Sequence, residues 1–145
     1  MDQRVNFVTI GTTDLARARR FYVGGLGWKP LFEVPDDVLF FQVGHGLTLS
    51  VWRREALLAE SGGGDAGDGV PPMTLSVNVA SESEVDSAYE LAVAAGGRPL
   101  APPARAEWGG YIGYLADPDG FRWEIAHNPG WSVDADGTVR LDAVD

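Results

Sequence analysis

Residues 108–129 read WGGYIGYLADPDGFRWEIAHNP, and this stretch decides the fold. Two apolar and aromatic runs flank Asp117-Pro118-Asp119-Gly120, where proline presets the backbone of the second turn position and glycine closes the turn. The pattern predicts a β-hairpin with one strand on each side of the turn. Alternation along the second strand places Trp123 on one face and Glu124 on the other. One face therefore belongs to a core, and the opposite face carries a lone carboxylate.

The composition is that of one globular domain. The chain has 145 residues, of which 45% are hydrophobic and 22% are charged, and it contains no cysteine. A chain of this length buries a core of useful size, and the lack of cysteine excludes disulfides, thiolate metal sites and a cysteine nucleophile. Neither a signal peptide nor a run of about 20 apolar residues is present. We therefore predict a cytoplasmic protein without a membrane partner.

The net charge limits the kinds of molecule that the protein is expected to bind. The formal charge is −10, from 21 Asp and Glu against 11 Lys and Arg. Phosphate binding needs the opposite sign, so the balance argues against nucleic acid as a partner. A cationic small molecule would be attracted, although acidity also simply keeps a protein soluble.

The two halves of the chain repeat one order of elements. For the first half we predict a strand over 5–11, a helix capped by Asp14 and ended at Gly24-Gly25, strands over 28–34, 38–43 and 47–52, and one or two helical turns over 53–60. For the second half we predict a strand over 73–80, a helix, a segment over 98–100, a Pro-rich connection through 102–103, and strands over 111–116 and 121–126. This is an internal repeat of architecture.

The helix of the second half has clear start and stop signals. Ser81 with Glu84 three residues later forms a capping box, and Gly96-Gly97 ends the helix. The predicted apolar stripe consists of Val85, Ala88, Leu91, Ala92 and Ala95.

These signals divide the chain into four segments. Residues 1–60 form the first module, 61–72 a flexible Gly-rich linker, 73–129 the second module, and 130–145 a C-terminal tail. Within the tail, an Asp-Gly turn at Asp136-Gly137 predicts a small hairpin over 131–141.

The chain resembles the vicinal oxygen chelate superfamily, which includes glyoxalase I, extradiol dioxygenases, fosfomycin resistance enzymes and bleomycin-binding proteins. The resemblance covers about residues 5–129. It rests on the order of Thr13-Asp14-Leu15, Phe21-Tyr22, Leu26-Gly27-Trp28, Glu84-Val85-Asp86, Ala95-Gly96-Gly97 and Asp117-Pro118-Asp119-Gly120 followed by Trp123-Glu124. The implied fold is α+β, with two tandem βαβββ modules whose cupped mixed sheets enclose a central groove. The resemblance also implies a homodimer, which would cover exposed sheet edges.

The resemblance implies a metal site that this chain lacks in part. Members hold a divalent metal with His, Gln or Glu on the first and fourth strand of each module. These positions fall near Phe7, Ser50, Val77 and Glu124, of which only Glu124 is a good ligand. Catalytic metal sites usually need about three protein ligands, and His45 and His127 lie in turns or after the last strand. We therefore predict no cofactor, with a weak magnesium or manganese site at Glu124 as the alternative.

Without a metal, the cup becomes a pocket for a small molecule. Besides the four implied positions, Trp52, Trp108 and Tyr111 are candidate lining residues, since aromatic rings stack on flat or cationic ligands. A shift of one residue in the 73–80 strand would aim Ser76 and Asn78 inward in place of Val77.

Three interpretations of Glu124 and two functions stay open. Glu124 is either an anchor for a basic ligand, a proton-transfer group, or a structural partner of Arg122 or Arg105. The first function is metal-independent binding of a small cationic or aromatic molecule, as in bleomycin-binding proteins. The alternative is a metal-dependent lyase or dioxygenase with an atypical ligand set around Glu124.

Overall fold

The computed structural model describes residues 5–61, 69 and 73–141. The chain forms two compact units, Met1–Val70 and Pro71–Asp145. The repeated βαβββ order is present once in each unit, as predicted. No helix in the described part of the chain is both long and apolar enough to cross a membrane. Most of the predicted linker 61–72 lies outside the described residues.

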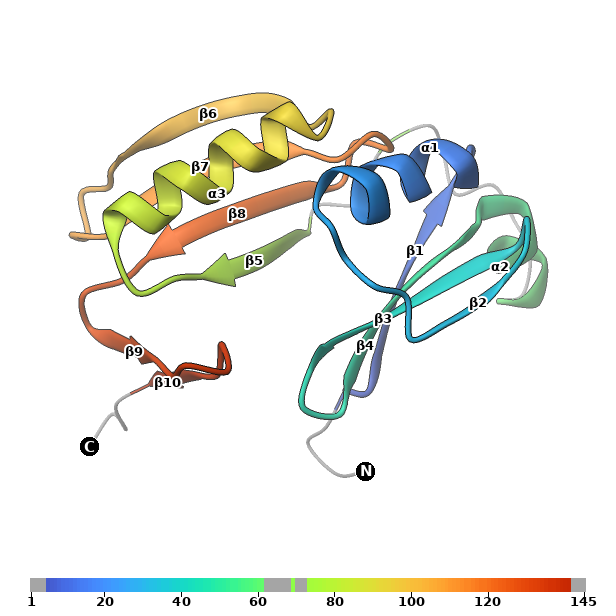
Figure 1. Cartoon of the computed structure of the whole chain (residues 1–145), viewed down its shortest axis with the longest axis horizontal. Helices are drawn as coiled ribbons and strands as arrows, with labels where there is room; N and C mark the ends of the chain where they lie inside the picture. The colour runs from blue at the N-terminus through green and yellow to red at the C-terminus, as the bar shows by residue number, and fades with distance from the viewer. Residues whose placement is uncertain (1–4, 62–68, 70–72, 142–145) are drawn as a thin grey trace. The chain divides into compact units, whose positions relative to one another are not determined.

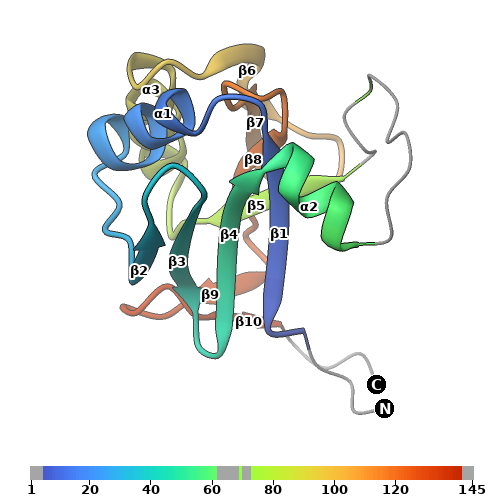
Figure 2. The same cartoon turned by 90° about the vertical axis from the view of Figure 1, so that its right-hand side faces the viewer.

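The first unit is a four-stranded mixed sheet with strand order β1-β4-β3-β2 (Figure 2). β1 and β4 are parallel, and the other two pairs are antiparallel. Its elements are β1 (Phe7–Thr12), α1 (Leu15–Arg19), η1 (Arg20–Gly25), β2 (Phe32–Val34), β3 (Val38–Gly44), β4 (Leu47–Arg53) and α2 (Arg54–Glu60).

The predicted first helix is present, but it changes from an α-helix to a π-helix along its length. Asp14 caps it, because its Oδ1 accepts a hydrogen bond from the Arg17 backbone N–H at 2.9 Å. The α-helix ends at Arg19 and continues as the π-helical segment η1. The buried ring of Tyr22 in η1 lies 5.7 Å from the ring of Phe41 on β3, so η1 covers this face of the sheet.

The predicted strand over 28–34 is too long at its start. Only Phe32–Val34 pairs with β3. Trp28 instead contacts the rings of Tyr22 and Phe41, at 5.4 and 5.5 Å between centroids. An aromatic side chain in an apolar run favours a strand locally, but here burial against the helix outweighs pairing.

The second unit repeats the plan with strand order β5-β8-β7-β6 and α3 on one side of the sheet (Figure 1). β5 and β8 are parallel, while β8, β7 and β6 are antiparallel neighbours. Its elements are β5 (Thr74–Asn78), α3 (Glu82–Ala94), β6 (Arg98–Arg105), β7 (Tyr111–Ala116), β8 (Arg122–His127), β9 (Trp131–Val133) and β10 (Val139–Leu141). The predicted C-terminal hairpin is the antiparallel pair β9 and β10.

The capping box of α3 is confirmed. Ser81 Oγ accepts from the Glu84 backbone N–H at 3.3 Å, and Glu84 Oε2 accepts from the Ala80 backbone N–H at 3.1 Å. The predicted apolar stripe is wrong at Leu91, which is 52% exposed, while Tyr89 is buried. Tyr89 packs where Gly113 of β7 leaves room, since a Cβ on Gly113 would lie 3.0 Å from its ring.

The Pro-rich connection predicted after residue 100 is part of a strand. β6 runs through Pro102 and Pro103 and pairs with β7 across two register shifts. β6 is the edge of its sheet, where the missing N–H of proline costs no ladder hydrogen bond.

The turn that decides the fold is built around Asp117. This residue is 3% exposed, and its Oδ1 accepts from the backbone N–H groups of Asp119 at 3.0 Å and Phe121 at 2.9 Å. The backbone N–H of Gly120, at φ +91°, donates to the Asp117 carbonyl at 3.0 Å. The β7–β8 hairpin is therefore formed as predicted.

Candidate functional site

Each unit has a sheet face opposite its first helix, and strand pairing defines the residues on it. In the second unit Glu124 lies between Ser76 and Tyr114. In the first unit Ser50 lies between Thr9 and Phe40 at the matching place. We call the face with Ser50 the first site face and the face with Glu124 the second site face. The first includes Phe7, Thr9, Phe32, Val38, Phe40, Gln42, Thr48, Ser50 and Trp52, and the second includes Thr74, Ser76, Asn78, Ile112, Tyr114, Arg122, Glu124 and Ala126.

The spacing from each helix cap shows which residues of the two site faces correspond. Thr9 stands five positions before the helix cap Asp14, and Ser76 stands five positions before the helix cap Ser81. Glu124 is therefore the counterpart of Ser50, and Tyr114 the counterpart of Phe40. The same fold position carries a charge in one unit and a small hydroxyl in the other.

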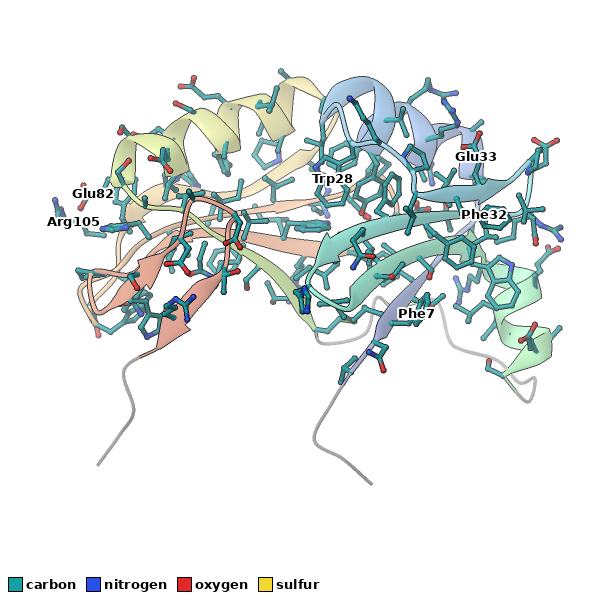
Figure 3. The ribbon with its side chains drawn as sticks, turned by 60° about the horizontal axis from the view of Figure 1, so that its bottom comes forward. Phe7, Trp28, Phe32, Glu33, Glu82 and Arg105 are labelled. Atoms are coloured by element: carbon teal, nitrogen blue, oxygen red, sulfur yellow. The ribbon has the colours of Figure 1, made fainter. Side chains whose placement is uncertain are left out.

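The Glu124 carboxylate is held by two hydroxyl groups. Ser76 Oγ donates to its Oε1 at 3.1 Å, and the Tyr114 hydroxyl donates to its Oε2. Both partners come from neighbouring strands, so the orientation of the carboxylate is fixed by the sheet. Neither predicted arginine is its partner, since Arg105 pairs with Glu82 at 2.8 Å (Figure 3) and Glu124 has no ion pair among the described residues.

The carboxylate changes the acidity of its neighbour. The hydrogen bond to Glu124, together with desolvation and the negative charge of Glu124, raises the pKa of Tyr114 to about 12. Tyr114 therefore stays protonated, and stays a donor, throughout the ordinary pH range.

We expect this hydrogen bond to be visible in a tyrosine titration. Because the pKa of Tyr114 is raised above its unfolded value, the stabilising bond is fully present below about pH 10 and is lost as pH rises through about 12. Phenolate absorbance at 295 nm should show a late-ionising tyrosine in the wild type that is missing in Tyr114→Phe. An unchanged titration curve in this variant would contradict the assignment.

The prediction that Val77 lies on the same face as Glu124 is wrong. β5 pairs Val77 with Ile125 and Ser76 with Glu124. Val77 therefore lies on the sheet face that α3 covers, and the alternative register, with Ser76 and Asn78 on the face of Glu124, is the observed one.

Tyr111 also belongs to the helix side. It lies opposite His127, and its hydroxyl donates to Asp86 Oδ1 on α3 at 2.9 Å. That hydrogen bond raises the pKa of Tyr111. The prediction that Tyr111 lines the same surface as Glu124 is therefore wrong, because the β7 residue beside Glu124 is Tyr114.

Trp108 lies outside both site faces. It is in the turn between β6 and β7 and is 58% exposed. Its ring folds over Gly110, where a Cβ would come within 1.9 Å of the ring. Gly110 is thus explained by the close approach of the tryptophan ring, and Gly109 by its φ of +97°.

Three predicted residues share the first site face. Phe7, Ser50 and Trp52 all point away from the side that η1 covers. Trp52 Nε1 donates to Asp37 Oδ1 at 3.2 Å, so its polar atom is occupied within the unit. Phe7 and Phe32 start and end an aromatic row on this face (Figure 3), with Phe40 between them at 6.4 and 5.9 Å between ring centroids.

The residues at the implied metal positions do not fit a divalent metal. Phe7 and Val77 offer no ligand atom and Ser50 offers only a neutral hydroxyl, so Glu124 is the one good ligand where about three are needed. His127 lies on the α3 side with its Nδ1 3.2 Å from the Val79 carbonyl oxygen. Across residues 5–61, 69 and 73–141, no three His, Asp or Glu side chains form a group that would hold an ion.

The aromatic residues of these faces that were not predicted as ligand contacts are Tyr114, Phe40 and Phe32. Tyr114 was open to prediction, because alternation in the 111–116 strand separates it from Tyr111 and the Asp-Gly turn fixes its position opposite Glu124. Phe40 and Phe32 carry no chemical signal in the sequence, since aromatic residues in strands are ordinary.

Comparisons with known proteins agree with this architecture. The model of the Glyoxalase/Bleomycin resistance protein/Dioxygenase superfamily matches residues 4–125. A glyoxalase-related enzyme from Fulvimarina pelagi is 41% identical, with a TM-score of 0.88 over 97% of this chain and 99% of that chain. Comparison with the curated proteins gave no match.

More distant structures share the fold. A glyoxalase/bleomycin resistance protein/dioxygenase from Nocardioides is 28% identical, with a TM-score of 0.70 over 88% of this chain and 84% of that chain. A lactoylglutathione lyase from Agrobacterium tumefaciens is 19% identical, with a TM-score of 0.71 over 92% of this chain and 100% of that chain. At that identity the likeness concerns the fold alone.

Proposed function

Because the chain belongs to the Glyoxalase/Bleomycin resistance protein/Dioxygenase superfamily, we propose that it binds a small cationic or aromatic molecule without using a metal. One observation carries this proposal. Glu124 is an oriented carboxylate on a sheet face away from α3, and among the described residues it has two hydroxyl partners but no ion pair, although Arg122 lies on the same face. A ligand with a protonated nitrogen would supply the missing positive charge.

The energetics favour a charged ligand group. Hydrogen bonds to charged groups contribute about 1.5–3 kcal/mol, roughly twice a neutral pair. Ser76 and Tyr114 each use one lone pair of an oxygen, and a carboxylate has about four acceptor positions. The remaining positions accept N–H groups without displacing either hydroxyl.

An anchoring role fits Glu124 better than a proton-transfer role. A general base must take a proton from the substrate within hydrogen-bond reach and return it later. Here the carboxylate is fixed by two donors from the sheet, and Tyr114 keeps its own proton because its pKa is raised to about 12. The arrangement supports recognition of charge over movement of protons.

The aromatic part of the proposal rests on the first unit. The row Phe7, Phe40 and Phe32 presents ring surfaces on the first site face, and Phe7 and Phe32 are largely exposed. Ring stacking adds about 0.5–1.5 kcal/mol beyond the area that is buried. Homodimer formation and a cytoplasmic location stay predictions.

The proposal is tested with matched ligands in the presence of a chelator. Benzylamine, protonated at pH 7, and benzyl alcohol differ mainly in charge, and ligand-observed NMR measures the binding of both. We expect a clear preference for benzylamine, and thermal stabilisation by cationic glycopeptides of the bleomycin type. Equal binding of the two probes, or turnover of a thioester or catechol without stabilisation by any cation, would contradict the proposal.

A further inference from the structure

The ring contact between Phe7 and Phe40 passes over a strand. Phe7 is on β1 and Phe40 on β3, and β4 lies between them. Phe7 stands opposite Thr48 and Phe40 opposite Ser50, so the two rings, 6.4 Å apart, meet above this part of β4. Thr48 and Ser50, on a face without α1 or η1, are only 8% and 2% exposed.

The hydroxyl under these rings is unsatisfied. Ser50 Oγ is buried and has no hydrogen-bond partner among the described residues. Buried polar groups nearly always have a partner, because leaving one unpaired destabilises the folded state. The pairing pattern gives Ser50 only Thr9 and Phe40 as direct neighbours on this face, and Phe40 has no polar atom.

We propose that Ser50, Phe7 and Phe40 form a subsite for a planar aromatic ring carrying a neutral hydrogen-bonding substituent, such as a phenol. The ligand ring packs against Phe40 and the ligand hydroxyl pairs with Ser50 Oγ. The proposal rests on the proposed function in assuming a small-molecule ligand, but it requires nothing of Glu124.

Phe7 is the movable part of this subsite. It is the first residue of β1, its ring is on the surface, and it is 58% exposed. Among the described residues its ring contact is with Phe40. A rotation of the Phe7 side chain uncovers Ser50 and frees one side of the Phe40 ring, while Phe32 keeps its contact on the other side.

The side chains of the first site face favour a neutral substituent on the ligand ring. The described residues of the first site face include no acidic side chain. Asp37, just before β3, is already bonded to Trp52 and Arg53, and Glu33 of β2 lies opposite Leu39 on the other face and pairs with Arg19. A serine hydroxyl both donates and accepts, so it pairs with a phenol in either direction.

The test compares phenol with toluene, which has the same ring and no polar group. Toluene has the greater hydrophobic driving force, so a preference for phenol requires a polar partner in the protein. In ligand-observed NMR we expect the wild type to bind phenol about tenfold more tightly than toluene, and Ser50→Ala to lose this preference. Ser87→Ala, in the helix of the other unit, should behave as the wild type. Equal affinities in the wild type, or an unchanged preference in Ser50→Ala, would overturn the proposal.

Two further measurements separate this role from a structural one. Ser50→Ala should unfold at the same temperature as the wild type or higher, because it removes an unpaired buried hydroxyl. A lowered unfolding temperature would show that the hydroxyl has a partner and would contradict the proposal. Phe7→Ala should bind phenol at least as tightly as the wild type, and loss of binding would contradict its role as a movable cover.

The outcome is independent of the proposed function. If the phenol preference depends on Ser50 while Glu124→Gln leaves the affinity for benzylamine unchanged, the cation proposal fails and the subsite stands. If Glu124→Gln lowers the affinity for benzylamine while phenol and toluene bind equally, the subsite fails and the cation proposal stands.

Discussion

Replacing Glu124 with glutamine is expected to abolish the preference for benzylamine over benzyl alcohol, with about a 10- to 100-fold loss of affinity for the amine. Glutamine keeps the length and the carbonyl acceptor, so Ser76 or Tyr114 still has an oxygen to donate to. The negative charge is lost, and with it the charge-assisted hydrogen bond to the ligand. Isothermal titration or ligand-observed NMR at low salt measures the change.

The matched control is Glu90→Gln. Glu90 is an exposed residue of α3, on the element that covers the opposite side of the sheet. The substitution changes the net charge of the protein by the same amount as Glu124→Gln. It therefore weakens the general attraction of the acidic protein for cations to the same extent, but leaves Glu124 in place. An equal loss of benzylamine affinity in both variants would show that overall charge, and not Glu124, binds the amine.

Asp117→Ala is expected to lower the free energy of unfolding by about 2–4 kcal/mol. The carboxylate is buried and accepts hydrogen bonds from the backbone N–H groups of Asp119 and Phe121. Alanine leaves both donors without their acceptor in the turn that sets the register of β7 and β8. Urea denaturation followed by tryptophan fluorescence measures the loss.

The chain contains its own control for this substitution. Asp136, in the β9–β10 hairpin, accepts from the Thr138 backbone N–H at 2.9 Å in an exposed turn, and this hydrogen bond lowers its pKa. Asp136→Ala should cost less than about 1 kcal/mol, because water replaces the lost acceptor there. If the two variants lose equal stability, burial of Asp117 is not what makes its turn important.

The sequence predicted the parts of the fold that depend on local signals. The β7–β8 hairpin follows from Asp117-Pro118-Asp119-Gly120, and the two helix starts follow from Asp14 and Ser81. The face that Glu124 occupies also follows locally, because it is counted from the turn. These signals fix backbone conformation within a few residues of where they stand.

Other features depend on pairing between distant segments. The 73–80 run alternates apolar Leu75, Val77 and Val79 with polar Thr74, Ser76 and Asn78, so it has one apolar face, but which side of the sheet that face takes is set by pairing with β8. The prediction turned the apolar face toward Glu124, whereas the pairing puts Ser76 there. Likewise, the unpaired hydroxyl of Ser50 is recognisable only when β1 and β3 have brought Phe7 and Phe40 together over it.

The most direct test of metal-independent recognition is the affinity of the wild-type protein for benzylamine, measured in excess EDTA and again with added manganese or zinc. Because Glu124 accepts from Ser76 and Tyr114 and the other implied ligand positions lack good donors, we predict the same affinity in both conditions. Binding that disappears in EDTA and returns with the metal would contradict the account.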